Sequence, residues 1–197
     1  MALRVGRNPT EQCLIFNHVI DFVYRTHQHR LNSWNQPFLN PRALEHYAQS
    51  IHSRGAPLEN CFGFVDDNLC KIARPKNNQR EVYRANDGTP LCLYGDPAYP
   101  LGIHLQAPFR NVHITPQMAR FNESMSEVRV AVEWMFGCVS NYYKFIDFRK
   151  QLQTGPSPAG KLYLVCGILQ NAHTCLYGNI VSDYFGVDPP NLVTYFW

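Results

Sequence analysis

The stretch Cys61-Phe62-Gly63-Phe64-Val65-Asp66 decides the fold. It is a short apolar run that ends in a carboxylate, and such runs between polar or glycine residues are typical of buried parallel strands. Leu91-Cys92-Leu93-Tyr94 is a second run, followed by Gly95-Asp96, and Asn111 to Ile114 is a candidate third. Because sites gather at the carboxyl ends of strands in open α/β sheets, the two aspartates are the first candidates for chemistry.

Two helices are predicted before these strands, in a helical segment over residues 1–58. Asn8-Pro9 and Asn40-Pro41 each combine an N-cap side chain with proline at the first helical position. The first helix is expected to run to about Thr26 and the second to end at Gly55. Their expected apolar faces are Leu14, Ile15, Val19 and Phe22 in the first helix and Leu44, Tyr47, Ala48 and Ile51 in the second.

Residues 59–197 are predicted to form one compact unit around the strands. Thr115-Pro116 fits a helix start, and the capping box Ser124 to Glu127 predicts the start of the longest helix. Another helix is expected after the Gly155-Pro156-Ser157-Pro158 break, and Asp188-Pro189-Pro190 opens a last turn. The expected buried positions are Val128, Val132, Met135, Val139, Tyr143 and Ile146 in the long helix and Leu162, Cys166, Leu169 and Leu176 in the next.

The composition indicates one globular domain. The 197 residues are 45% hydrophobic and only 17% charged, which excludes a disordered chain and a coiled coil. The longest stretch without polar residues, Leu162 to Leu169, is too short to span a bilayer, and no signal pattern is present, so neither membrane insertion nor secretion is expected. Seven cysteines without a C-x-x-C pair predict reduced thiols in an intracellular protein. A net charge of +3 favours a polyanionic partner only weakly.

Glu133 is the third candidate acid, in the most apolar part of the long helix. A glutamate buried there needs a cation or metal partner, and Arg129 is one turn away. In one interpretation Glu133 pairs with Arg129, Asp96 caps a turn and Asp66-Asp67 opens a loop. In the other, Asp66, Asp96 and Glu133 converge on divalent cations, because Mg²⁺ prefers hard carboxylate oxygens.

The acidic residues stand within motifs that resemble a known family. In chain order these are Gly63-Phe64-Val65-Asp66, Ile72-Ala73-Arg74-Pro75, Tyr94-Gly95-Asp96-Pro97-Ala98-Tyr99-Pro100-Leu101, Phe121-Asn122 and Arg129-Val130-Ala131-Val132-Glu133-Trp134-Met135-Phe136-Gly137. Together they resemble the catalytic domain of Harbinger (PIF) type transposases and the nucleases derived from them, which are DDE superfamily endonucleases. The resemblance extends from about Pro9 to the C-terminus.

The resemblance implies an α/β, RNase H-like fold and a metal-dependent endonuclease that cleaves phosphodiester bonds in DNA. By matching position, Asp66, Asp96 and Glu133 become its catalytic triad and hold two Mg²⁺ or Mn²⁺ ions, with Arg129 and Asp67 in support. It also implies a nuclear location and a Myb-like or helix-turn-helix partner that finds the DNA.

This sequence differs from the family pattern at its first motif and in length. The motif is Asp66-Asp67-Asn68 where the family has Asp-Gly-Thr, and strand alternation allows only one of the two aspartates to face the metals. Only Asp67 to Pro90 stands where the family has its second and third strands, which lie outboard of the first. We therefore expect a truncated fold with a weakened activity, and a first strand whose exposed edge favours self-association.

Two further possibilities remain open at this stage. The chain could be a non-catalytic remnant that acts as a DNA- or protein-binding module, or an accessory subunit that pairs with an intact transposase. The basic residues Arg74, Lys76, Arg80 and Arg84 could follow a DNA backbone, although a solvated loop has the same composition.

Overall fold

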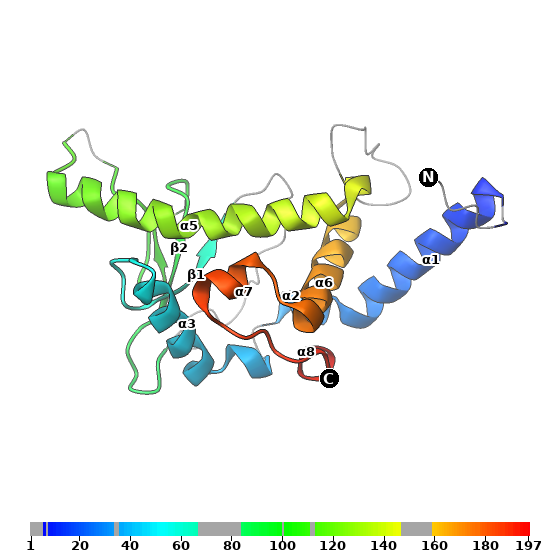
Figure 1. The fold of residues 1–197 in the computed structure, drawn as a ribbon, viewed down its shortest axis with the longest axis horizontal. Coiled ribbons are helices and arrows are strands. Elements are labelled where there is room, and N and C mark those ends of the chain that lie inside the picture. Colours follow the sequence, from blue (N-terminus) through cyan, green and yellow to red (C-terminus); the bar gives the residue numbers. More distant parts are fainter. Residues whose placement is uncertain are drawn as a thin grey trace.

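A small parallel sheet lies beneath one long helix in the computed structural model, and the remaining helices surround this unit or extend from it (Figure 1). The structure describes residues 6, 8–33, 36–66, 84–99, 101–110, 113–146 and 159–197. The elements are α1 (Pro9–His27), α2 (His29–Asn32), α3 (Pro41–Ser53), β1 (Cys61–Val65), β2 (Cys92–Gly95), β3 (Leu105–Gln106), α5 (Pro116–Tyr142), α6 (Ala159–Tyr177), α7 (Ile180–Phe185) and α8 (Leu192–Phe196), with short 3₁₀ turns at Pro37–Leu39 and Lys144–Ile146. No helix within these residues combines the length and apolar character needed to cross a membrane.

The sheet has the order β1-β2-β3, and both pairs are parallel. The expected first and second strands are confirmed. The third is wrong: β3 is Leu105–Gln106, and His113 and Ile114 lie outside any strand on the way into α5. In the described residues β1 is an edge strand.

A bulge in β1 sets which side chains face each side of the sheet. Cys61 pairs with Cys92 but Gly63 pairs with Leu93, so Phe62 is the extra residue. Beyond the bulge, Phe64 shares a core cluster with residues of α5. Phe62 lies in the cluster on the α3 side of the sheet.

Helix α3 follows its sequence pattern closely. The Asn40 side chain accepts a hydrogen bond from the backbone N–H of Ala43 at 3.0 Å, which caps the helix. The helix ends before Gly55, whose φ of 99° is left-handed as expected. Three of the four positions in its predicted apolar face are buried, Leu44, Ala48 and Ile51, and Tyr47 is partly buried.

Helix α5 begins at Pro116, where Thr115-Pro116 predicts a helix start, and not at the capping box Ser124 to Glu127. Thr115 caps it by accepting a hydrogen bond from the Met118 N–H at 3.2 Å, and Pro116 occupies the first position. Ser124 therefore lies inside the helix, because the earlier cap already nucleates the same apolar face. The buried residues of α5 are Met125, Val128, Ala131 and Val139.

The predicted apolar face of α1 is wrong, although its N-cap and extent are confirmed. Leu14, Val19 and Phe22 are 65%, 51% and 62% exposed. The packed side is the opposite one, where Ile20 joins the core with α6 and Val23 and Tyr24 pack against it.

Helix α6 is correct in position, and its predicted face is half confirmed, since Leu169 and Leu176 are exposed. Leu162 and Cys166 are buried, together with Val165 and Ile168. Leu176 is 57% exposed. The cysteines in the described residues are all free thiols, as predicted.

Candidate functional site

The two candidate aspartates stand at the carboxyl ends of neighbouring parallel strands. Val65 and Gly95 are the last paired residues of β1 and β2, and Asp66 and Asp96 come next in each chain segment. Strand alternation after the bulge places both on the side of the sheet that α5 covers, the side of Tyr94. The sheet thus brings two carboxylates to one edge, beneath one helix.

Arg129 of α5 connects this helix to the first aspartate. Its guanidinium Nη1 lies 3.3 Å from Oδ1 of Asp66, and both side chains are about three-quarters buried. One of the two interpretations paired Arg129 with Glu133, and this pairing is wrong for the described residues, because Arg129 contacts Asp66 at the end of β1 instead. Glu133 is exposed rather than buried, which removes its need for a compensating cation.

Glu133 nevertheless lies on the same side of α5 as the aspartates. It follows Arg129 by four residues, which is one helical turn and about 6 Å of rise. Residues at this spacing share a helix face, so Glu133 is the next side chain along from the one that contacts Asp66.

Asp96 is held in a tight turn, as one of the two interpretations predicts. Its carboxylate accepts a hydrogen bond from the Ala98 N–H at 2.8 Å, and its carbonyl accepts one from the Tyr99 N–H. Gly95 is required here, since a Cβ at this position would lie 2.9 Å from the Tyr99 ring. The spacing Gly95-Asp96-x-x-Tyr99 is therefore a packing unit that fixes the aspartate.

Phe121 and Asn122 attach the segment after β3 to α5. Asn122 both accepts from the Phe109 N–H, at 2.9 Å, and donates to the Phe109 carbonyl, at 3.1 Å. The Phe121 ring contacts the rings of Phe109 and Tyr94 edge-on. The motif thus holds α5 in register over β2, a role that its residue types alone did not reveal.

The donor chemistry at this edge fits a divalent cation, but the gathered set has two acids. Mg²⁺ is commonly held by one or two carboxylates plus substrate oxygens, which Asp66 and Asp96 can supply. In the described residues, no group of three His, Cys, Asp or Glu side chains is close enough to hold a metal. Whether Glu133 completes the set therefore stays a prediction.

Asp67, Arg74, Lys76 and Arg80 lie outside the described residues. Arg84 is exposed, forms an isolated antiparallel bridge with Pro90, and donates to the Gly88 carbonyl at 3.3 Å.

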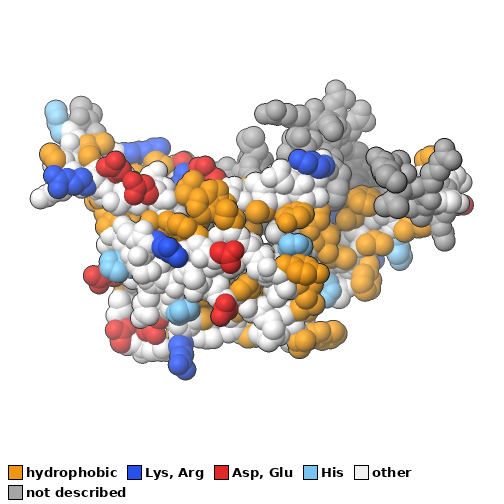
Figure 2. Space-filling model, in the orientation of Figure 1, with side chains coloured by type: hydrophobic (Ala, Val, Ile, Leu, Met, Phe, Trp, Pro, Cys, Tyr) orange, Lys and Arg blue, Asp and Glu red, His pale blue; other side chains and the backbone are white. Residues whose placement is uncertain are grey.

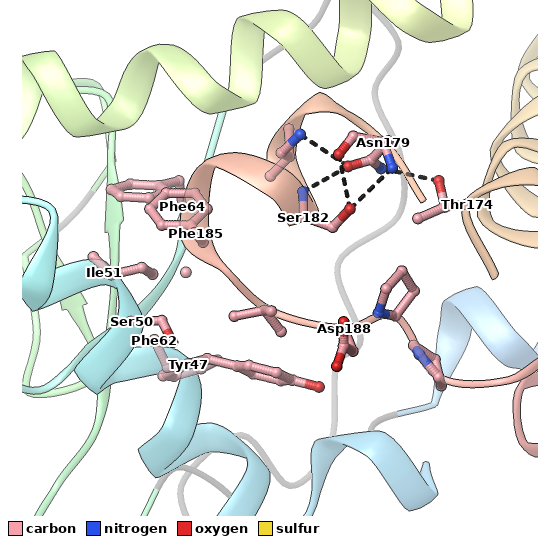
Figure 3. Close-up of a pocket in the computed structure, with 15 residues that line it drawn as sticks. Tyr47, Ser50, Ile51, Phe62, Phe64, Thr174, Asn179, Ser182, Phe185 and Asp188 are labelled. Atoms are coloured by element: carbon pink, nitrogen blue, oxygen red, sulfur yellow. Dashed lines mark hydrogen bonds between the residues drawn. The ribbon is translucent and has the colours of Figure 1, made fainter. Parts of the chain in front are cut away.

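A pocket of about 310 Å³ lies beside β1, and neither Asp66 nor Asp96 lines it (Figure 3). Phe62, Gly63 and Phe64 form one wall, and Phe185 of α7 stacks on Phe64 with ring centroids 6.4 Å apart. The wall residues include one acid, Asp188, and no lysine or arginine. This lining does not suit a phosphate backbone, so the pocket is not part of the candidate site.

The comparison with protein families agrees with the strand-end geometry. The family model described as DDE superfamily endonuclease matches residues 65–171, a little over half of the chain. The chain belongs to the DDE superfamily endonuclease family. The matched region of this DDE endonuclease contains Asp66, Asp96, Arg129 and Glu133, whereas α1 and α3 lie outside it. Neither the curated proteins nor the solved structures contain a significant match.

The Arg129–Asp66 contact makes a measurable prediction for stability. Both side chains keep about a quarter of their exposure, so we expect a coupling free energy of about 0.5–1 kcal/mol, in the range of partly exposed ion pairs. A double-mutant cycle with Arg129→Met and Asp66→Asn in urea unfolding measures it. A coupling that is zero at low salt would contradict the contact, and high salt should reduce it.

Proposed function

We propose that this DDE endonuclease is a Harbinger-type, RNase H-like nuclease domain that cleaves phosphodiester bonds in DNA through Asp66, Asp96 and Glu133. The observation that carries the proposal is the register of β1 and β2, which ends in two carboxylates at the same sheet edge. The parallel order β1-β2-β3 also corresponds to the first, fourth and fifth strands of the RNase H-like fold that the sequence motifs suggest.

In this proposal each acid has a distinct task. Asp66 and Asp96 bind the cation from adjacent strands, and Glu133 approaches from α5. A bound pair of Mg²⁺ or Mn²⁺ ions supplies Lewis-acid activation of the attacking water and of the leaving oxygen. Arg129 holds the Asp66 carboxylate at the strand end, so it is a positioning residue, and a bound cation would take the place of this contact.

We further propose DNA as the substrate, a Myb-like or helix-turn-helix protein as the targeting partner, and a nuclear location. The activity should be weak, because the exposed Glu133 lacks the tight support that catalytic groups need. The edge position of β1 in the described residues supports the further proposal that a second chain pairs with it.

A plasmid-nicking assay tests the proposal. The full chain with Mn²⁺ should nick supercoiled DNA slowly and without sequence preference, and EDTA should stop it. Glu133→Ala should lower the rate, whereas the matched control Glu127→Ala, an exposed acid on another face of α5, should not. Nicking that is unchanged in Glu133→Ala would show a contaminating nuclease.

The alternative function is a non-catalytic module that binds DNA or protein. The favourable observation is that both aspartates already have partners, Arg129 and the Ala98 N–H. Salt-dependent DNA binding without nicking by any variant would favour this alternative.

A further inference from the structure

Helix α1 carries an apolar face that no other element of the described chain covers. Leu14, Ile15, Val19 and Phe22 are 65%, 45%, 51% and 62% exposed. The opposite side of the helix is packed, because Ile20 is buried and Val23 and Tyr24 pack against the same core cluster. A surface helix normally has one apolar stripe, so an apolar second face indicates a second partner.

The position of α1 leaves this face accessible. Figure 1 shows α1 as the outermost helix at one end of the molecule, extending away from the sheet and α5. Hydrophobic side chains are also visible near this end in the space-filling view (Figure 2). The family match begins at residue 65, after α1.

The order of residues along the exposed face is symmetric about His18. Glu11 and Arg25 lie seven residues to either side, and Leu14 and Phe22 lie four to either side. All five are exposed and fall within one stripe at helical spacing. In an antiparallel pair of two such helices, Leu14 of each chain faces Phe22 of the other, and Glu11 of each faces Arg25 of the other.

The same two-fold arrangement also matches the flanks of the stripe. Ile15 and Val19 lie on one flank of the stripe. A two-fold axis perpendicular to the helices places this flank of one chain beside the same flank of the other chain. In a parallel pair, Glu11 would face Glu11 and Arg25 would face Arg25, which is repulsive at both ends. Apolar and charge complementarity therefore both select the antiparallel arrangement.

We propose that α1 is a dimerisation arm, on which a second copy of this chain docks its own α1 in antiparallel orientation about His18. The occupant is a second copy because the charges are complementary to the same helix reversed, with acid at one end and base at the other. The interface is small, so the dimer should be in reversible exchange with the monomer.

Sedimentation velocity on the full chain, over a roughly hundredfold range of concentration, tests the arm. The wild type should show a monomer–dimer equilibrium, and Phe22→Glu should weaken it about a hundredfold, since a charge would replace Phe22 in both of its contacts with Leu14 of the other chain. Ile103→Glu is the matched control, because Ile103 is 72% exposed in the segment between β2 and β3. A monomeric wild type, or association unchanged in Phe22→Glu, would overturn the proposal and leave the β1 edge as the remaining candidate.

Charge reversal tests the orientation. Glu11→Arg and Arg25→Glu should each weaken self-association about tenfold at low salt, because both ends of the dimer become repulsive. An equimolar mixture of the two variants should associate at least as well as the wild type, since every facing pair is again opposite in charge. Failure of the mixture to recover would overturn the antiparallel arrangement. Circular dichroism melting curves should be close for the wild type, Phe22→Glu and Ile103→Glu, because these side chains are exposed in the monomer. Glu11→Arg and Arg25→Glu should each lower the stability slightly and to a similar extent, because they reverse the favourable charges in the first and last turns of α1.

Discussion

Asp96→Asn is expected to lower the rate of Mn²⁺-dependent DNA nicking by about a hundred- to a thousandfold, the loss typical when a preorganised charge-stabilising group is removed. Asparagine keeps the side-chain oxygen that accepts from the Ala98 N–H at 2.8 Å, so the turn after β2 should survive. The change therefore removes the negative charge while it preserves the local structure. Initial rates of plasmid nicking measure the effect.

The control for this experiment is the metal response of the folded state. Mn²⁺ should raise the melting temperature of the wild type more than that of Asp96→Asn, because a ligand stabilises the state that binds it. Mn²⁺ should also raise the melting temperature of Asp66→Asn less than that of the wild type, since Asp66 supplies the second carboxylate of the pair. Equal stabilisation of all three proteins would place the metal elsewhere.

Met125→Ala is expected to lower the free energy of unfolding by about 2–5 kcal/mol, the range for large-to-small changes in a well-packed core. Met125 is completely buried between α5 and the sheet, in the cluster that contains Cys61, Cys92 and Tyr94. Its removal also loosens the helix that carries Arg129 one turn later. Urea unfolding followed by circular dichroism measures the change.

Two matched variants separate packing from a general effect of substitution. Met125→Leu conserves volume and should cost less than about 1.5 kcal/mol. Leu176→Ala, at a position that is 57% exposed, should change stability by about 0.5 kcal/mol or less. A Met125→Ala effect as small as that of Leu176→Ala would contradict the placement of α5 over the sheet.

The strands that carry the site could be predicted because their signal is local. Cys61–Val65 and Cys92–Gly95 are apolar runs with sharp polar boundaries, and each boundary is an aspartate. The bulge at Phe62 could not be predicted, since it depends on pairing with β2 rather than on the strand's own sequence. It nevertheless decides that Asp66 faces α5.

The hydrophobic periodicity predicted the position of α1 correctly, but it predicted the wrong side of the helix as the buried one. The helix has apolar residues on two sides, and sequence cannot tell which one meets α6 when both satisfy the helical spacing. The same limit applies to Glu133, whose apolar neighbours predicted burial although the side chain points to solvent. The Arg129–Asp66 pair joins residues 63 positions apart in the sequence, and a contact over this separation cannot be predicted from residue spacing.

The most direct test of the account is a crystal structure of the full chain soaked in Mn²⁺, with anomalous differences recorded. We expect a peak between the carboxylates of Asp66 and Asp96, with oxygen distances of about 2.0–2.2 Å, and Glu133 turned toward it. The Arg129–Asp66 contact should then be broken. No peak at this sheet edge, with Asp66 still on Arg129 at saturating Mn²⁺, would contradict the proposed nuclease site.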